Sequence, residues 1–280
     1  MSNRNQRSRI GRDTLDILNR GGYLNSRGVD VSIASFLNEA KNGTVLIRSQ
    51  EIDALLGVTP VADFQTTIQV SNETTLSVAR RWVDEGRSKI LCLNFASAMY
   101  PGGGFLEGSQ AQEESLARAS SLYECLLQSS DYYAANRKFK SNLYRDHFIY
   151  SPDVPDFRDD DDQLLDEPYL VSFLTAPAVD RGAVETNEPR KLHLVDSIMR
   201  RRVRAGFAIA QKYRYQHLVL GAWGCGVFRK HPNDIATVFA DQLVGERARY
   251  GKSFAHVQFA VLDLGQDGAT LHAFIERSQH

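Results

Sequence analysis

Hydrophobic residues recur in two alternating patterns over the second two thirds of the chain. Short apolar runs such as KILCLNFAS at 89–97 and HLVLGAW at 217–223 have the length and composition of buried strands. Between such runs, apolar residues return every three or four positions over about 110–129, 189–213 and 233–249, which is typical of amphipathic helices. Alternating strands and helices predict an α/β fold with a mostly parallel sheet covered on both faces.

Two more apolar strands are expected at His147–Ser151 and Tyr169–Ala176, and HVQFAVLD near the C-terminus reads as another. The first two flank an acidic segment, Asp156–Asp166, which contains the run Asp159–Asp162. Adjacent carboxylates repel each other unless they are solvated or bound to a cation. The alternating ligands of an EF-hand are missing, so the pattern favours a solvated loop over a calcium site.

The first 85 residues follow a different pattern, in which short helices are separated by weakly extended segments. Helices are predicted up to Gly21, over Ser32–Lys41 and over Asn72–Glu85, with a β-branched run at Thr44–Ile47. We therefore expect a mainly helical accessory region at 1–85, packed on a core formed by 86–280.

The composition is that of a globular protein. The 280 residues are 42% hydrophobic and 24% charged, and 33 Lys and Arg residues face 34 Asp and Glu residues. A net charge of −1 excludes a global field that would hold duplex nucleic acid or an anionic membrane, so a polyanion has to bind locally. The three cysteines lack C-x-x-C spacing, and no long apolar run occurs, so we expect a soluble cytoplasmic protein.

Three consecutive glycines, Gly102, Gly103 and Gly104, follow the first core strand and precede a helix. Without a Cβ, their backbone N–H groups can approach an anion at the helix N-terminus, which points to a phosphate-bearing ligand. Glu107 stands where a dinucleotide fingerprint requires glycine, and Ser109 stands where a P-loop requires lysine. A tight turn without a ligand remains the alternative.

The sequence after the glycines places Glu113 and Glu114 in the first turns of a helix. Ser109 and Gln112 have the spacing of a capping box. Neighbouring helical residues diverge by about 100°, so these carboxylates are not expected to face each other as the pair of ordinary glycosidases does. The alternative is that both merely stabilise the helix N-terminus, with Glu114 paired to Arg118.

A second glycine-rich segment, Gly221–Phe228, also ends a strand and precedes a helix. Two such loops can bracket one diphosphate. Trp223 and Phe228 offer flat surfaces for a ribose or base, or they serve packing. Cys225 is expected to be a small buried residue and not a nucleophile.

The string NFASAMYPGGGFLEGSQAQEESLARASSLY resembles the G-G-G and Q-E-E signature of the bacterial-type poly(ADP-ribose) glycohydrolases, which are macrodomain proteins. GAWGCGVF resembles the diphosphate-binding loop of that family, and RDTLDILNRGGY resembles its N-terminal helical extension. The resemblance covers nearly the whole chain. It implies a macrodomain-like three-layer α/β/α fold with a central mixed, mostly parallel sheet and an N-terminal helical extension.

The resemblance also assigns roles to single residues. It places Glu114 as catalytic acid and base beside Glu113, which with Gln112 positions the substrate. It implies that the terminal ribose and the diphosphate are bound by Asn94, Gly102, Gly103, Gly104, Gly224, Gly226, Val227 and Phe228. Phe274 is a candidate to stack on adenine, or a core residue. The charged Glu107 departs from the family pattern.

The implied activity is hydrolysis of ribose–ribose O-glycosidic bonds from the chain terminus, which releases ADP-ribose. One carboxyl group can first protonate the departing oxygen and then activate water, so neither a cofactor nor a metal is expected. The implied partners are poly(ADP-ribose), ADP-ribose and ADP-ribosylated proteins, in the DNA damage response. Two alternatives stay open: removal of single ADP-ribose units from proteins, and binding without catalysis.

A basic cluster of Arg200, Arg201, Arg202 and Arg204 falls on the helix predicted over about 189–213. It is either a solvated helix face or a track for the polymer, whose units carry two charges each.

Overall fold

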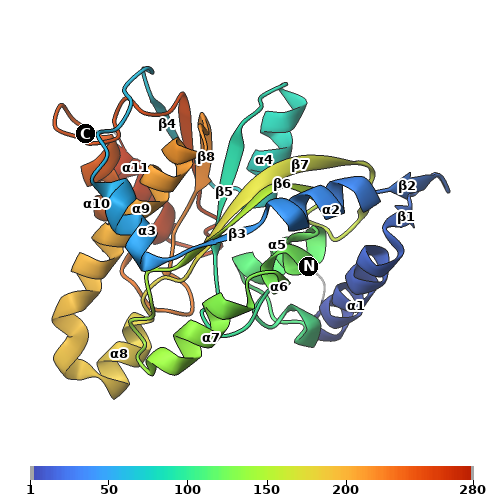
Figure 1. Cartoon of the computed structure of the whole chain (residues 1–280), viewed down its shortest axis with the longest axis horizontal. Helices are drawn as coiled ribbons and strands as arrows, with labels where there is room; N and C mark the ends of the chain where they lie inside the picture. Colours follow the sequence, from blue (N-terminus) through green and yellow to red (C-terminus); the bar gives the residue numbers. More distant parts are fainter. Residues whose placement is uncertain (1–2, 279–280) are drawn as a thin grey trace.

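The computed structural model describes residues 3–278 and is built on a seven-stranded sheet of order β3-β6-β7-β5-β8-β9-β4 (Figure 1). The strands of this sheet are β3 (Val45–Ile47), β4 (Thr67–Ser71), β5 (Ile90–Phe95), β6 (Phe148–Arg158), β7 (Leu164–Ala176), β8 (His217–Leu220) and β9 (His256–Ala260). All neighbouring pairs from β7 to β4 are parallel, whereas β6 is antiparallel to both β7 and β3. The predicted mixed, mostly parallel sheet is confirmed.

Helices cover both faces of the sheet (Figure 1). One layer holds α3 (Ser49–Leu56), α9 (Val195–Lys212), α10 (Pro232–Leu243) and α11 (Ala269–Ser278). The other holds α2 (Ala34–Gly43), α4 (Thr75–Asp84), α5 (Gln112–Ala119), α6 (Leu122–Leu127) and α7 (Ser130–Phe139). β5 supplies both cores, because side chains alternate along a strand: Leu91 and Leu93 face the first layer, and Ile90 and Cys92 face the second. The three-layer α/β/α arrangement is confirmed.

The first 85 residues both join the sheet and pack on it. β3 and β4 form its two edges, so the sheet does not divide at residue 85. The part of the first 85 residues that lies outside this sheet begins with α1 (Arg4–Arg20). This helix ends at Gly21, which is in the left-handed region at φ 73°. The hairpin of β1 (Gly22–Leu24) and β2 (Asp30–Ser32) follows and encloses a small core with α1.

The helix expected over 110–129 is two helices, α5 and α6, because Ser120 between them is extended. Ser120 forms a β-bridge with Asp156, and Ser121 N donates to Pro155 O at 3.0 Å. Pairing with β6 therefore interrupts a sequence whose spacing is helical throughout. The helix expected over 189–213 likewise begins as a 3-10 turn, Pro189–Leu194, before α9. A short helix, α8 (Arg181–Asn187), precedes that turn.

The acidic run Asp159–Asp162 is the loop of the β6–β7 hairpin, and Asp159, Asp160 and Asp161 are exposed, as expected of a solvated loop. The loop is shorter than predicted, because both ends of the segment 156–166 belong to the two strands. Asp160 Oδ2 accepts from Thr74 Oγ1 and Ser77 Oγ, and Asp162 pairs with Arg118 at 3.3 Å. Asp156 is fully buried, and burial holds its pKa well above the usual range. The hairpin thus contacts the first turn of α4 and the last turn of α5.

Among residues 3–278, no helix combines the length and the apolar character needed to cross a membrane.

Candidate active site

Two glycine-rich loops lie at the same edge of the sheet, because they follow the neighbouring parallel strands β5 and β8. The first runs from Ala96 to α5 and contains the 3-10 turn η1 (Phe105–Glu107). The second runs from Gly221 to α10. The carboxyl ends of parallel strands are the usual ligand-binding edge of such sheets.

The glycines of the first loop are required by its backbone and its packing. Gly102 and Gly103 have φ of 68° and 58°, where side chains are rarely tolerated. A Cβ on Gly102 would lie 3.0 Å from the Phe105 ring, and one on Gly104 would lie 2.6 Å from Ser109 Oγ. A Cβ on Gly103 would overlap the carboxylate of Glu114.

The helix α1 holds the first loop from outside. Ser8 Oγ donates to Leu106 O at 2.6 Å, and Arg4 Nε donates to Glu107 O at 3.0 Å. Gly11 permits the close approach of α1 to this loop, since a Cβ on Gly11 would lie 3.0 Å from Phe105 O. The side chain of Glu107 is exposed, so this departure from the family pattern leaves the loop backbone unobstructed.

Glu113 and Glu114 both lie near Gly103, and their carboxylates are held by different backbone N–H groups. Glu114 Oε1 accepts a hydrogen bond from Gly104 N at 3.1 Å, and Glu113 Oε2 would lie 3.3 Å from a Cβ on Gly103. Glu114 Oε2 has no hydrogen-bond partner within residues 3–278 and is available to a ligand. The loop curls over the first turn of α5 and so meets both carboxylates.

The two interpretations that assigned these residues to helix stability are wrong. The N-cap of α5 is Ala111, which makes no side-chain cap, so Ser109 and Gln112 do not form a capping box. Arg118 does not pair with Glu114. It pairs with Asp162 and donates to Ser109 O at 3.0 Å.

Glu113 is a buried carboxyl group with only 3% of its surface exposed. Its Oε2 accepts from Ser97 N at 2.6 Å, and its Oε1 accepts from Asn94 Nδ2 at 3.3 Å. Desolvation raises the pKa of Glu113 to about 8, assisted by the nearby charge of Glu114 and opposed by these hydrogen bonds. Glu113 therefore carries a proton at neutral pH.

Asn94 lies near the end of β5, just before the loop, and is fully buried beside Glu113. Its Nδ2 also donates to Thr175 Oγ1 at 3.1 Å, which leaves Oδ1 without a partner within residues 3–278. An unpaired buried amide atom costs free energy unless a ligand pairs with it. Asn94 thus offers a preformed hydrogen-bonding position at the base of the site.

Gln112 lies on the opposite side of β5 and is engaged by the protein itself. Its Oε1 accepts from Phe95 N at 2.8 Å, and its Nε2 donates to Leu93 O at 2.7 Å and Thr75 Oγ1 at 3.1 Å. These bonds fix the first turn of α5 to the end of β5. Both polar atoms of the Gln112 amide are therefore used within the protein.

The second loop presents an open backbone. Gly224 has φ of 83° and packs on Ala178, whereas a Cβ on Gly226 would meet no atom within 4 Å. Val227 is 80% exposed, and the half-buried ring of Phe228 lies 6.2 Å from that of Tyr144. An exposed apolar residue beside open glycine backbone is suited to cover a bound ligand.

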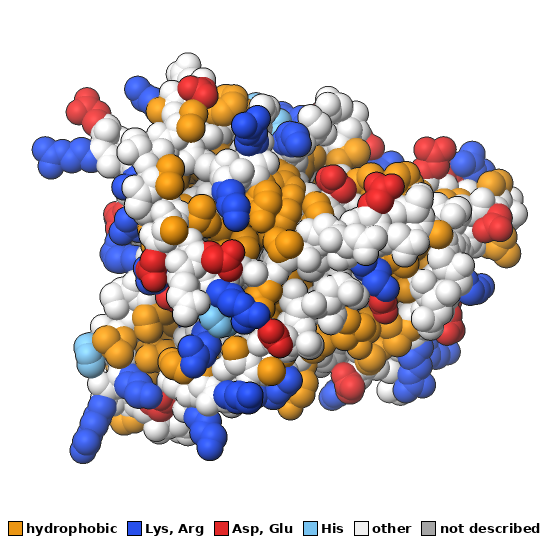
Figure 2. All heavy atoms as spheres, in the orientation of Figure 1, with side chains coloured by type: hydrophobic (Ala, Val, Ile, Leu, Met, Phe, Trp, Pro, Cys, Tyr) orange, Lys and Arg blue, Asp and Glu red, His pale blue; other side chains and the backbone are white. Residues whose placement is uncertain are grey.

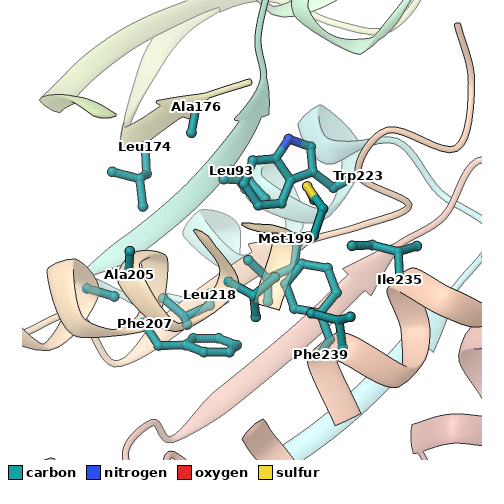
Figure 3. Packing of buried hydrophobic residues seen from close by; sticks show 14 of the residues in the cluster. Leu93, Leu174, Ala176, Met199, Ala205, Phe207, Leu218, Trp223, Ile235 and Phe239 are labelled. Atoms are coloured by element: carbon teal, nitrogen blue, oxygen red, sulfur yellow. The ribbon is translucent and has the colours of Figure 1, made fainter. Parts of the chain in front are cut away.

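Three aromatic or sulfur side chains of the sequence analysis do not line the site. Trp223 is buried in the core with Leu93 and Met199 (Figure 3). Phe274 is 1% exposed, and its ring lies 5.2 Å from that of Phe259, so it is a core residue and not an adenine stacker. Cys225 is half-buried, and burial raises the pKa of its thiol to about 12, which excludes a thiolate nucleophile at neutral pH.

Sequence reasoning missed Lys230, a buried residue near the end of the second loop. Its side chain is 1% exposed and packs against Gly224. The Nζ atom makes no hydrogen bond within residues 3–278 and lies 3.7 Å from Asp196 Oδ1, and burial lowers its pKa. A buried ammonium below this loop favours an anion above it. A charged residue shortly after a glycine loop carries no signal of burial in the sequence.

Three of the four arginines of the predicted basic cluster on α9 are engaged by the protein itself. Arg200 pairs with Asp241, and Arg201 pairs with Asp53. Arg202 is fully buried, pairs with Asp146 at 2.8 Å and donates to three carbonyl oxygens, those of Pro177, Leu143 and Tyr144. These arginines tie α9 to its surroundings. No group of three or more His, Cys, Asp or Glu side chains suited to a metal ion occurs in residues 3–278.

Comparison with known proteins identifies relatives of the whole chain. The family described as microbial-type PARG, catalytic domain, matches residues 11–159. None of the curated proteins compared with the chain matches it. A poly(ADP-ribose) glycohydrolase from Thermomonospora curvata bound to the inhibitor ADP-HPD is 42% identical, with a TM-score of 0.92 over 98% of this chain and 100% of that one.

A poly(ADP-ribose) glycohydrolase from Deinococcus radiodurans in complex with ADP-ribose is 46% identical, with a TM-score of 0.81 over 86% of this chain and 96% of that one. The chain therefore belongs to the microbial-type poly(ADP-ribose) glycohydrolase (PARG) family.

Proposed function

We propose that this protein hydrolyses the ribose–ribose O-glycosidic bonds of poly(ADP-ribose) from the chain terminus and releases ADP-ribose. Its family is one of glycosidases that act on this polymer. The observation that carries the proposal is the convergence of Glu113 and Glu114 on Gly103, at the end of β5 and beside the loop after β8. A carboxyl pair next to an anion-binding backbone is what cleavage next to a diphosphate requires.

In this proposal the two glycine loops hold the terminal ADP-ribose unit. Backbone N–H groups of Gly102, Gly103 and Gly104 line the ribose and the diphosphate, and Gly224 and Gly226 approach the diphosphate from the other side. Val227 and Phe228 cover it. The open space at Gly226 and the buried Nζ of Lys230, which makes no hydrogen bond within residues 3–278, support this placement.

Asn94 and protonated Glu113 would bind the hydroxyl groups of the terminal ribose. Asn94 has a free amide atom there, and a neutral carboxyl group can both donate and accept a hydrogen bond. Gln112 would position the substrate indirectly, through the bonds that fix α5 to β5. This arrangement places the anomeric carbon beside Gly103, in reach of Glu114.

Glu114 would then act in two steps. Its carboxylic acid gives a proton to the departing 2′-oxygen as the C–O bond breaks and positive charge develops on the ribose. The resulting carboxylate takes a proton from water, which bonds to the anomeric carbon, so the proton given in the first step is regained. The free Oε2 suits this exchange, while Gly104 N–H holds Oε1.

Incubation with purified poly(ADP-ribose) and, separately, with a mono-ADP-ribosylated protein tests the substrate class. We expect free ADP-ribose to accumulate from the first polymer turnover, without oligomers, and the protein-linked unit to remain. Release from the mono-ADP-ribosylated protein alone would assign the second activity considered above. Binding without any release would make the protein a reader of ADP-ribose.

The cellular substrates in this proposal are ADP-ribosylated proteins. The proposal includes a cytoplasmic location and a role in the DNA damage response.

A further inference from the structure

Exposed cations gather beside the first glycine loop, on α7 and on the segments that pack against its end. We define them as the basic rim: Arg137, Lys138, Lys140, Arg145, Arg190 and Arg229. All six are exposed, and none has an ion-pair partner within residues 3–278. Lys and Arg side chains accordingly gather over α7 and α8 in Figure 2.

The rim is joined to both loops of the site. Arg137 Nη1 donates to Met99 O at 2.7 Å, just before the three glycines. On the other side, Gly182 N donates to Phe228 O at 3.3 Å, and Arg229 packs on Gly182. Cations of the rim therefore border the position assigned to the scissile bond and continue toward the second loop.

Nearby carboxylates do not neutralise the rim, because they are engaged elsewhere. Glu188 accepts from Asn142 N at 2.7 Å and pairs with Lys191, and these bonds hold its pKa at about 2. Glu185 pairs with Arg181, and Asp146 pairs with two buried or half-buried arginines of α9. The unpaired charge at this edge is thus positive.

Aromatic surface accompanies the positive charge. Phe139 is 38% exposed, and the Arg145 guanidinium lies 4.9 Å from its ring centre. Tyr100, next to the Met99 carbonyl that Arg137 binds, is 64% exposed. Cations interleaved with exposed aromatic rings are the composition that binds flexible single-stranded nucleic acids, by phosphate contacts and base stacking.

We propose that the basic rim binds the diphosphates of the ADP-ribose units that precede the terminal unit of a poly(ADP-ribose) chain. The inference rests on the proposed function, which places the bond to the preceding unit beside Glu114 and Gly103. The next diphosphate emerges at this edge, where the rim offers cations for its charges and rings for its adenine. The rim takes the place of the α9 arginines as the surface that distinguishes a chain from free ADP-ribose.

The test compares the salt dependence of kcat/KM on long polymer between wild type and the variant Lys138→Gln/Lys140→Gln/Arg190→Gln. Each phosphate contact on a single strand contributes about 0.7 to the log–log salt slope. Losing three contacts should lower the slope by about 2, so between about 50 and 200 mM salt the wild type should lose about 15-fold more of its kcat/KM than the variant does. Calorimetry with ADP-ribose, which does not reach the rim, checks that the site is intact.

The matched control is Lys212→Gln/Arg247→Gln/Lys252→Gln, which removes three exposed cations near the starts of β8 and β9, at the opposite edge of the sheet. It should keep the wild-type slope. Equal salt slopes in wild type and the rim variant would contradict polymer binding by the basic rim. Absence of ADP-ribose release by the wild type would instead contradict the proposed function. Inhibition by duplex DNA of matched phosphate number as strong as that by uncleavable polymer would also overturn the polymer assignment.

Discussion

Glu113 shows how burial sets the charge of a single residue in the site. Its pKa of about 8, raised by desolvation, means that the group is neutral at pH 7 and becomes an anion above about pH 8. In its neutral form, the Glu113 carboxyl group does not repel the negatively charged diphosphate of the proposed substrate. Deprotonation of Glu113 places a negative charge in the site, against the diphosphate of the ligand.

We therefore predict that ADP-ribose affinity falls above pH 8 in the wild type, by about fivefold, which corresponds to about 1 kcal/mol of added repulsion. The variant Glu113→Gln remains neutral and should bind with a flat profile from pH 7 to 9.5. Calorimetry at matched ionic strength measures both. An equal fall in the two proteins would show that another group titrates in this range.

Whether single residues could be predicted depended on what fixes them. Gly103 and Glu114 have a local signature, so the sequence placed them together. Asn94 was predicted only through the family resemblance, and Lys230 was not predicted. The structural reason for Asn94 is that contacts to Thr175 and Glu113, which are distant in sequence, leave its Oδ1 unpaired. Such contacts form only when the sheet is assembled, and local pattern carries no trace of them.

At the scale of elements, the two glycine loops have different mechanical roles. A Cβ on Gly103 overlaps Glu114 in the protein itself, whereas a Cβ on Gly226 enters open space. The first loop needs glycine for its own folding and for the position of the acid. In the second loop, Gly224 is likewise required by its φ of 83° and its packing on Ala178, whereas Gly226 is needed only for the approach of a ligand.

Gly103→Ala is accordingly predicted to lower both the stability and the turnover. The free energy of unfolding should fall by roughly 1–3 kcal/mol, because the position has a positive φ that alanine adopts only with strain. Gly226→Ala should leave the urea unfolding midpoint unchanged and weaken ADP-ribose binding at least tenfold. Unfolding and calorimetry on the two variants make the comparison. Equal loss of stability in both, or undiminished affinity in Gly226→Ala, would contradict the assignment.

Element boundaries were predicted well where caps or glycines set them and poorly where tertiary pairing did. α1 ends at Gly21 as its sequence indicates. The break between α5 and α6 arises because Ser120 pairs with Asp156 of β6, although the helical spacing of the segment continues. The acidic run is an exposed loop as its composition indicates, but its hydrogen bonds to Thr74 and Arg118 come from other elements and had no sequence signal.

At the scale of the whole molecule, the edge of the sheet opposite the site holds a second group of titratable residues. His217 and His256 start β8 and β9 and lie with their ring centres 5.1 Å apart, against Trp82 of α4. Burial, assisted by His256 and Arg87, lowers the pKa of His217 to about 4. The cluster joins α4 to β9 and to β8, the strand that precedes the second loop.

The unfolded chain, with a histidine pKa of about 6.5, binds more protons than the folded one between about pH 6.5 and 4. Stability should therefore be full above about pH 7 and fall as the pH drops toward 4, by up to about 2 kcal/mol at pH 5. His217→Phe should reduce this fall. Urea unfolding at pH 7.5 and 5.0 tests it, and an unchanged pH dependence in the variant would assign the acid limb to other groups.

The central claim is that Glu114, held against Gly103 by the loop, performs the chemistry on a substrate bound by both glycine loops. The most direct measurement is a single-turnover rate of ADP-ribose release from poly(ADP-ribose) by wild type and Glu114→Gln, together with ADP-ribose affinity and the unfolding midpoint of each. We predict a rate lowered about 10²–10⁴-fold, the range for loss of a general acid or base, with affinity and midpoint nearly unchanged. Full activity with a small loss of stability would contradict the account and return Glu114 to a role in the helix alone.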